Sequence, residues 1–234
     1  MTGRGKHFLV AKKVRKLLGA LFSLLMVTGV SAGDLEGTVE IHSRLGRRPI
    51  GKLQRHPGQN NGPLYQAPAK VSAAVDEVSN VVIFLLDTPG GPNKPVHTKM
   101  NQKNRQFSPY VLPIVRDSTV DFVNGDGIFH SVYSQCECAP FHLPEFPQGE
   151  SRSIHFPQPG DVELFCAIHP EMNAHILVLD TGFFVTPDEN HKFKLEDVPA
   201  GRRVLKAWHP RLRNPVTKII DVPPSGSLHI DLAL

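Results

Sequence analysis

The sequence lacks the features that mark an α-helical protein, a nucleic-acid-binding protein or a hydrolase. No long stretch carries apolar residues at the helical period of 3.6, and no internal repeat is present. No basic patch interleaved with aromatic residues is available to bind nucleic acid. No Ser-His-Asp arrangement or pair of carboxylates points to a hydrolase site. These absences favour a β-protein with a function other than nucleic-acid binding or hydrolysis.

Tyr and Trp are scarce, with three and one residues, whereas Phe, Pro and Gly occur 13, 21 and 19 times. Frequent turn-forming residues without helical apolar faces favour an all-β protein built from many short strands. About 200 residues remain once the N-terminal segment described next is removed, which is enough for one large or two small β domains.

The N-terminal segment predicts a secretory signal peptide over residues 1–32. Six basic residues precede an apolar stretch, Leu17 to Val30, which ends in the small-residue sequence Val30-Ser31-Ala32. We expect cleavage after Ala32, a periplasmic or secreted mature protein and no membrane span, because the apolar stretch is short for a transmembrane helix. An uncleaved anchor is the alternative. Loss of the six basic residues changes the net charge from +4 to −2, so the basic pI is no sign of nucleic-acid binding.

The stretch Cys166-Ala-Ile-His169-Pro-Glu-Met172 places a thiolate, an imidazole and a thioether within one short turn. Cys and Met favour Cu(I), and imidazole binds Cu(II) as well, so a loop with all three donors can hold both redox states of copper. Residues 161–165 before the loop and 175–179 after it have the pattern of strands. We therefore expect a copper-binding loop between two strands.

The remaining donor is expected 36 residues before Cys166, at His130. His130 follows an alternating strand at 120–123 and a turn rich in Gly, Asn and Asp. Asn124 and Asp126 are expected to shape this turn through side-chain hydrogen bonds and not to bind the metal. The alternative, a buried Cys, a surface His and a core Met that lie together by chance, is disfavoured because all the donor types occur in order between strands.

With these residues in place, the segment from about residue 96 to 180 resembles a cupredoxin. Its ligand loop has the short spacing of amicyanin and not the longer one of plastocyanin. The chain is similar to a group of plastocyanin-like periplasmic proteins, often labelled methylamine-utilisation-like, in which a further β domain ends near a Trp-His-Pro sequence such as Trp208-His209-Pro210. The motifs that carry this resemblance are Met100–Pro109, Val123–Asp126, His130–Ser134 and Cys166–Met172.

The resemblance implies a Greek-key β-sandwich that holds one type 1 copper centre, with Cys166, His130 and His169 in a near-trigonal plane and Met172 as the weak axial donor. It implies one-electron transfer without enzymatic activity, and a transient redox partner that is a cytochrome or an oxidoreductase. The edge of His169 would be the site of electron exit and docking. A copper-binding or copper-delivery module with the same ligands is the alternative. A copper oxidase or nitrite reductase would need a second metal centre, and the sequence has no His-x-His pair to build a trinuclear one.

Two features depart from the resemblance. The residue after the first ligand histidine is often Asn in cupredoxins, where its side chain ties the two ligand loops together; here it is Ser131, whose hydroxyl is shorter. The pair Cys136 and Cys138 is also unusual for the group. A tight disulfide, a second soft-metal site that includes His142, and free thiols all stay open for this pair. His155 and His175 lie in predicted strands and are expected to be structural or surface residues.

The rest of the chain predicts a second small β-sandwich of the carboxypeptidase-regulatory or transthyretin type at 181–234, in which Trp208 lines a core. We expect an exposed loop at 44–70, N-terminal strands within 33–95, a cupredoxin domain at 96–180, and a hairpin at 149–160. Strands predicted at 34–41 and 80–86 would complete the second sandwich, which would make the copper domain an insertion. The five strands predicted in 181–234 are 183–185, 193–195, 203–208, 217–222 and 228–232.

Overall fold

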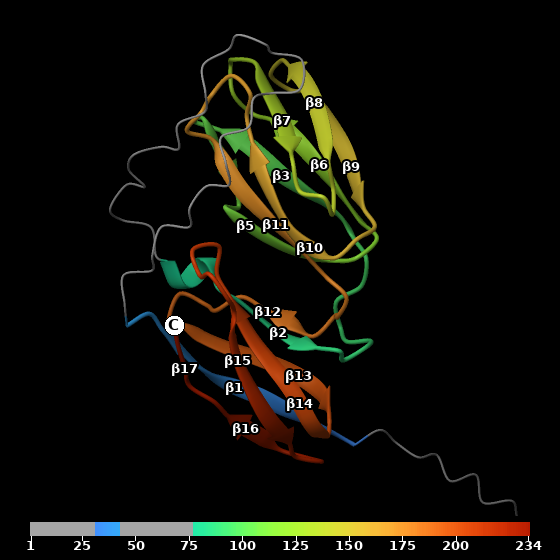
Figure 1. Ribbon diagram of the computed structural model, residues 1–234, viewed down its shortest axis with the longest axis vertical. Coiled ribbons are helices and arrows are strands. Elements are labelled where there is room, and N and C mark those ends of the chain that lie inside the picture. The colour runs from blue at the N-terminus through green and yellow to red at the C-terminus, as the bar shows by residue number, and fades with distance from the viewer. Residues whose placement is uncertain (1–30, 43–76) are drawn as a thin grey trace, which may run out of the picture.

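The computed structural model describes residues 31–42 and 77–234, in which the regular structure is β-strand except for one short 3₁₀ helix (Figure 1). The predicted all-β class is confirmed. The predicted loop at 44–70 and nearly all of the predicted signal peptide lie outside the described residues. Among the residues that are described, no helix is long and apolar enough to cross a membrane.

Nine strands in the middle of the chain form a two-sheet unit, which we call the central sandwich (Figure 1). One sheet has the strand order β5-β11-β10-β7-β8 and the other β4-β3-β6-β9. β11 runs parallel to β5, and β3 runs parallel to β6, whereas the other pairs are antiparallel. The strands are β3 His97–Lys103, β4 Gln106–Ser108, β5 Val111–Val115, β6 Ser118–Asn124, β7 His130–Ser134, β8 Phe141–Phe146, β9 Ser151–Phe156, β10 Gly160–Phe165 and β11 Asn173–Leu179.

The core of the central sandwich lies between its two sheets and is rich in Phe. Successive side chains of a strand point to opposite faces, and in β6 every second residue from Ser118 to Asn124 is buried. Phe122, Phe146 and Phe156 are fully buried in this core. Burial of one such side chain contributes roughly 1.5–3 kcal/mol. Phe suits this position because, unlike Tyr or Trp, it has no polar group that needs a partner.

The predicted hairpin at 149–160 is wrong. β9 pairs with β6 in one sheet, whereas β10 pairs with β11 and β7 in the other, so the chain crosses between the sheets at residues 157–159. Pro157 and Pro159 lack the backbone N–H groups that a paired turn uses. The turn residues showed where the chain bends but not which sheet the next strand joins.

The remaining strands form a second two-sheet unit, the flanking sandwich, with its own apolar core. β2 follows a short 3₁₀ helix, Glu77–Asn80, and pairs with β12 and β14, which lie after the central sandwich in the chain. A pairing of β2 within the central sandwich, which would exclude the insertion hypothesis, is not the pairing observed. The domain boundaries and the type of this sandwich stay predictions. Its strands are β1 Ala32–Glu40, β2 Val82–Leu86, β12 Phe184–Val185, β13 Lys192–Pro199, β14 Gly201–Trp208, β15 Val216–Val222, β16 Ser227–His229 and β17 Leu232–Ala233.

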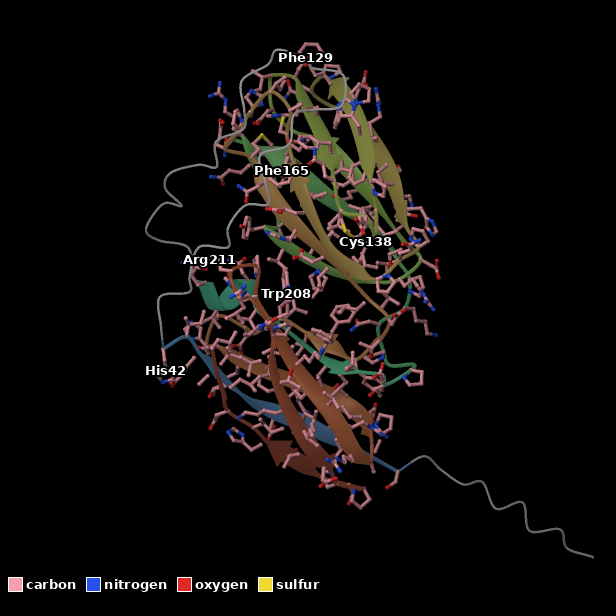
Figure 2. All side chains as sticks on the ribbon, in the orientation of Figure 1. His42, Phe129, Cys138, Phe165, Trp208 and Arg211 are labelled. Atoms are coloured by element: carbon pink, nitrogen blue, oxygen red, sulfur yellow. A yellow bond between two sulfur atoms is a disulfide. The ribbon has the colours of Figure 1, made fainter. Side chains whose placement is uncertain are left out.

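A third apolar cluster joins the two sandwiches. In β2, Ile83 and Leu85 face the core of the flanking sandwich, whereas Val82 and Phe84 face the central sandwich. Trp208 is buried in this cluster, where the two sandwiches meet (Figure 2). Burial on both faces explains why the sequence over β2 is continuously apolar and does not alternate. The other members of the cluster are Val111, Leu177 and Leu179.

Candidate metal centre

Three of the predicted copper ligands converge at one end of the central sandwich. The ligand atoms of His130, Cys166 and His169 all lie within 4.8 Å of one another, and no other His, Cys, Asp or Glu residues in the described part of the chain form such a group of three. The two Nδ1 atoms of the histidines are 3.0 Å apart, and the Sγ of Cys166 lies 3.7 Å from Nδ1 of His169. The labelled Phe129, which precedes His130, lies at the end of the molecule away from the flanking sandwich (Figure 2).

Strand register brings the two ligand loops together. Phe165, the last residue of β10, is paired with Tyr133 of β7 on one side and with Asn173 of β11 on the other. The loop between β10 and β11 is closed by its own backbone, because the Met172 amide donates to the carbonyl of His169 at 3.0 Å and the Cys166 amide donates to that of Met172 at 3.3 Å. The Cys-x₂-His-x₂-Met spacing therefore makes one compact turn beside β7.

Met172 lies at the base of this turn. Its side chain is buried in the same core cluster as Cys166, among apolar residues of both sheets. A thioether in this position needs no hydrogen-bond partner and is a soft donor. The burial of Met172 in this cluster distinguishes it from a loop methionine at the surface.

His130 is oriented by Asp126. Nε2 of His130, which is fully buried, lies 2.8 Å from Oδ2 of Asp126, so this nitrogen carries the proton and Nδ1 presents its lone pair to the other ligands. Asp126 also accepts hydrogen bonds from the amides of Asn104 and Arg105, at 2.6 and 3.0 Å. Burial raises the pKa of Asp126, but these hydrogen bonds and the one to His130 outweigh burial and lower the pKa below its usual 3.8.

The turn before His130 is shaped by Asn124, as predicted. Its Oδ1 accepts a hydrogen bond from the Asp126 amide at 2.9 Å, and its Nδ2 donates to the carbonyls of Ile128 and Phe146 at 2.8 and 2.9 Å. Asp126, which is expected to shape the same turn, also contacts His130, a role that the sequence did not predict. A carboxylate four residues before a ligand histidine, within one turn, is the signal that was available for it.

His169 is the ligand that reaches the surface. Its side chain is partly exposed, whereas His130 and Cys166 are buried. Burial, and to a lesser degree the neighbouring His130, lower the pKa of His169 below its usual 6.5, so the ring stays neutral and keeps a lone pair. Ile128, Phe129 and Ile168 lie in the two ligand loops and are 39, 53 and 40 % exposed. We call these three residues the apical patch.

Ser131 ties the two ligand loops together although it is shorter than Asn. Its Oγ accepts a hydrogen bond from the Ala167 amide at 2.8 Å. The Ser131 amide donates to the Sγ of Cys166 at 3.5 Å, and the hydroxyl lies 3.6 Å from the same sulfur. The link between the two ligand loops is therefore made by a hydroxyl and a backbone amide of Ser131.

The other cysteines, and the other histidines of residues 31–42 and 77–234, are not part of this group. Cys136 and Cys138 form a disulfide with a Cα–Cα distance of 5.2 Å, which leaves Cys166 as the free cysteine. The labelled Cys138 lies at the other end of the central sandwich from Phe129 (Figure 2). With both sulfurs in a disulfide, the soft-metal site considered with His142 is not formed. His155 is exposed, and His175 is buried and bonded to Asp161 at 2.8 Å.

The donor set fits copper. Two neutral imidazoles and one thiolate around a common point are the ligands of trigonal copper sites, in which a long thioether bond completes the coordination. The three donor atoms lie close enough together to bind one ion in common. The residues present at the centre thus match the group that the ligand loop predicts.

Of the comparisons with known proteins, only the one with solved structures found similar proteins. No protein-family model matches the chain, and no curated protein is similar to it. A copper-containing nitrite reductase (NirK) from Thermus scotoductus SA-01 is 31% identical over 37% of this chain and 22% of its own, with a TM-score of 0.34. A purple cupredoxin from Nitrosopumilus maritimus is 20% identical over 35% of this chain and 99% of its own, with a TM-score of 0.32. A reduced amicyanin variant is 19% identical over 35% of this chain and 80% of its own, with a TM-score of 0.33.

The central sandwich has a cupredoxin-like fold. Two facing sheets carry a His-Cys-His group on two loops at one end, as the resemblance of residues 96–180 to a cupredoxin predicted. The chain spans about a fifth of the length of the nitrite reductase, with 22% covered. Because the TM-scores are low, the case for copper rests on the donor residues themselves.

Proposed function

We propose that the protein is a periplasmic type 1 copper protein that transfers one electron at a time. The observation that carries this proposal is the convergence of the His130, Cys166 and His169 ligand atoms within 4.8 Å of one another. Met172, which is buried in the same core cluster as Cys166, is assigned as the axial ligand. Copper held there would accept and release one electron by cycling between Cu(I) and Cu(II).

The protein's part in this function is to hold the ligands in one arrangement for both redox states. Asp126 fixes the ring of His130 through Nε2, and Ser131 fixes the Cys166 loop through the Ala167 amide. Ligands held by such partners need little movement when the charge of the centre changes. Small reorganisation favours electron transfer and gives no advantage to a copper-storage site.

The apical patch is proposed as the docking surface for the redox partner. It lies in the two ligand loops, one of which carries His169, the partly exposed member of the His-Cys-His group. A rim ion pair between Arg105 and Glu171, at 3.9 Å, borders this region. Redox encounters use small, weak interfaces, which suits a transient partner such as a cytochrome or another oxidoreductase. No catalytic turnover is assigned to the protein.

The periplasmic location is supported by the chemistry of the cysteines. A disulfide between Cys136 and Cys138 persists in an oxidising compartment and is rare in the cytosol. The predicted signal peptide at 1–32 leads to the same compartment.

The experiment that tests the proposal is reversible reduction of the copper-loaded protein, followed by its visible spectrum. We expect an intense thiolate-to-copper band in the oxidised protein, its loss on reduction and its return on reoxidation. The Cys166→Ser variant should lack the band and can still bind copper. A wild-type protein that binds copper without a reversible band, and does not exchange electrons with a cytochrome, would instead be a copper-delivery module.

A further inference from the structure

Gln102 is a fully buried polar residue in the core at the ligand end of the central sandwich. It lies on β3, where the inward positions also include the apolar Met100. Glutamine is seldom fully buried. Its Nε2 donates a hydrogen bond at 3.3 Å to the carbonyl of Ser131 on β7, which belongs to the opposite sheet. Gln102 therefore links the two sheets directly behind the first ligand histidine.

The amide of Gln102 is only half satisfied. Its Oε1 is buried and accepts no hydrogen bond from the described residues. An unpaired buried acceptor destabilises a fold, and an unbranched apolar side chain such as Met could fill similar space without this penalty. A buried polar group that lowers the stability of the folded protein points to a role other than packing.

The partner of Gln102 is the residue that holds the ligand thiol. The Ser131 amide donates to Sγ of Cys166 at 3.5 Å, and the Ser131 hydroxyl lies 3.6 Å from the same sulfur. Because Oγ accepts the Ala167 amide at 2.8 Å, its own hydrogen is free to point at the sulfur. Ser131 thus offers the thiolate two donors, and Gln102 fixes Ser131 from the other side.

We propose that Gln102 is a positioning residue for the copper centre, which acts through Ser131 to keep two hydrogen-bond donors on the Cys166 thiolate. This inference rests on the proposed function. Hydrogen bonds to a ligand thiolate withdraw electron density from it and favour the reduced centre, so they raise the reduction potential. Gln102 would therefore tune the potential from the opposite sheet, without touching the metal.

The test is Gln102→Met, with Met100→Leu as the matched control on the same strand and in the same core. For Gln102→Met we expect a copper-free protein at least as stable as the wild type, since an unpaired acceptor is removed. Its reduction potential should be lower than that of the wild type, and its thiolate-to-copper band should shift. Met100→Leu conserves volume and leaves Ser131 alone, so its potential and band should be those of the wild type.

A second pair of variants shows whether Gln102 acts through Ser131. Ser131→Ala should lower the potential further than Gln102→Met does, and Gln102→Met should shift it less in the Ser131→Ala background than in the wild type. Gln102→Leu provides a second substitution if Gln102→Met does not fold. A wild-type potential and band in the folded Gln102 variants would overturn the inference. A copper-loaded wild-type protein without a thiolate band would overturn the proposed function instead. The wild-type spectrum therefore separates this failure from a failure of the inference about Gln102.

Discussion

Nε2 of His130 and Oδ2 of Asp126 lie 2.8 Å apart, and this single contact decides which nitrogen of the ring faces the other ligands. The carboxylate accepts a hydrogen bond from Nε2–H, so Nδ1 carries the lone pair and lies 3.0 Å from Nδ1 of His169. The amides of Asn104 and Arg105 hold the carboxylate in turn. Protein groups therefore fix the orientation of the His130 ring.

Replacing Asp126 by Asn should weaken copper binding. The neutral Asn amide accepts the hydrogen bond from Nε2–H of His130 less strongly than a carboxylate does, so the tautomer of the ring is no longer fixed. Such changes lower metal affinity about 10–100-fold. Competition with a chelator measures this change. Asp121→Asn is the matched control, since Asp121 also binds a histidine, His97, at 2.7 Å, but on the exposed face of the sandwich. Equal affinities in the two variants would contradict the role given to Asp126.

The copper-free protein should become less stable as the pH is lowered, because of His209. This residue is fully buried in the flanking sandwich, where it accepts the Arg211 amide at 3.1 Å and lies 3.2 Å from a Glu77 carboxylate oxygen. Burial, and then the nearby Arg211, lower the pKa of His209 from 6.5 to about 4. As the pH falls from about 6.5 to about 4, His209 becomes protonated in the unfolded chain while it stays neutral in the native state. Stability from this group is therefore complete above pH 6.5 and is lost towards pH 4, by on the order of 3 kcal/mol.

Urea unfolding of the His209→Gln variant as a function of pH measures this loss. The variant should show a flatter dependence on pH between about 6.5 and 4 than the wild type does. His229→Gln replaces an exposed histidine and should leave the slope unchanged. An unchanged slope in His209→Gln would mean that His209 is protonated in the native state as readily as in the unfolded one.

The disulfide should matter little for the copper centre. It joins Cys136 to Cys138 and closes a very short loop, so its removal should destabilise the protein by only about 1–2 kcal/mol. The Cys136→Ser/Cys138→Ser double variant should keep the visible band of the wild type, because its sulfurs lie at the other end of the sandwich from the ligands. Denaturation and the spectrum of the same sample check both statements. Loss of the band would place these sulfurs in the copper site.

The apical patch should control the rate of electron exchange and not the reduction potential. Phe129→Ser removes the most exposed of its apolar side chains, and loss of one apolar contact of about 1.4 kcal/mol slows the encounter about tenfold. Stopped-flow mixing with a cytochrome gives the rate. Ile219→Ser is the control, since Ile219 is 61 % exposed on β15 of the flanking sandwich. Equal rates in both variants would move the docking surface elsewhere.

The convergence of Cys166 and His169 with His130 could be predicted because a loop of soft donors at this spacing is confined to one turn. The role of Met172 stays a prediction. His130 needed only the strand-and-turn pattern before it. Gln102 could not be predicted, because β3 carries polar residues on both faces, and an inward glutamine there looks like an outward one. The crossing of the chain between sheets after β9 depends on long-range pairing, which local turn residues do not encode.

The copper-loaded crystal structure, with anomalous data collected at the copper edge, tests the central claim most directly. We expect one copper peak bonded to Nδ1 of His130, Nδ1 of His169 and Sγ of Cys166, with the sulfur of Met172 at a longer axial distance. A peak at any other residues, or a copper ion that leaves His130 unbound, would contradict the claim.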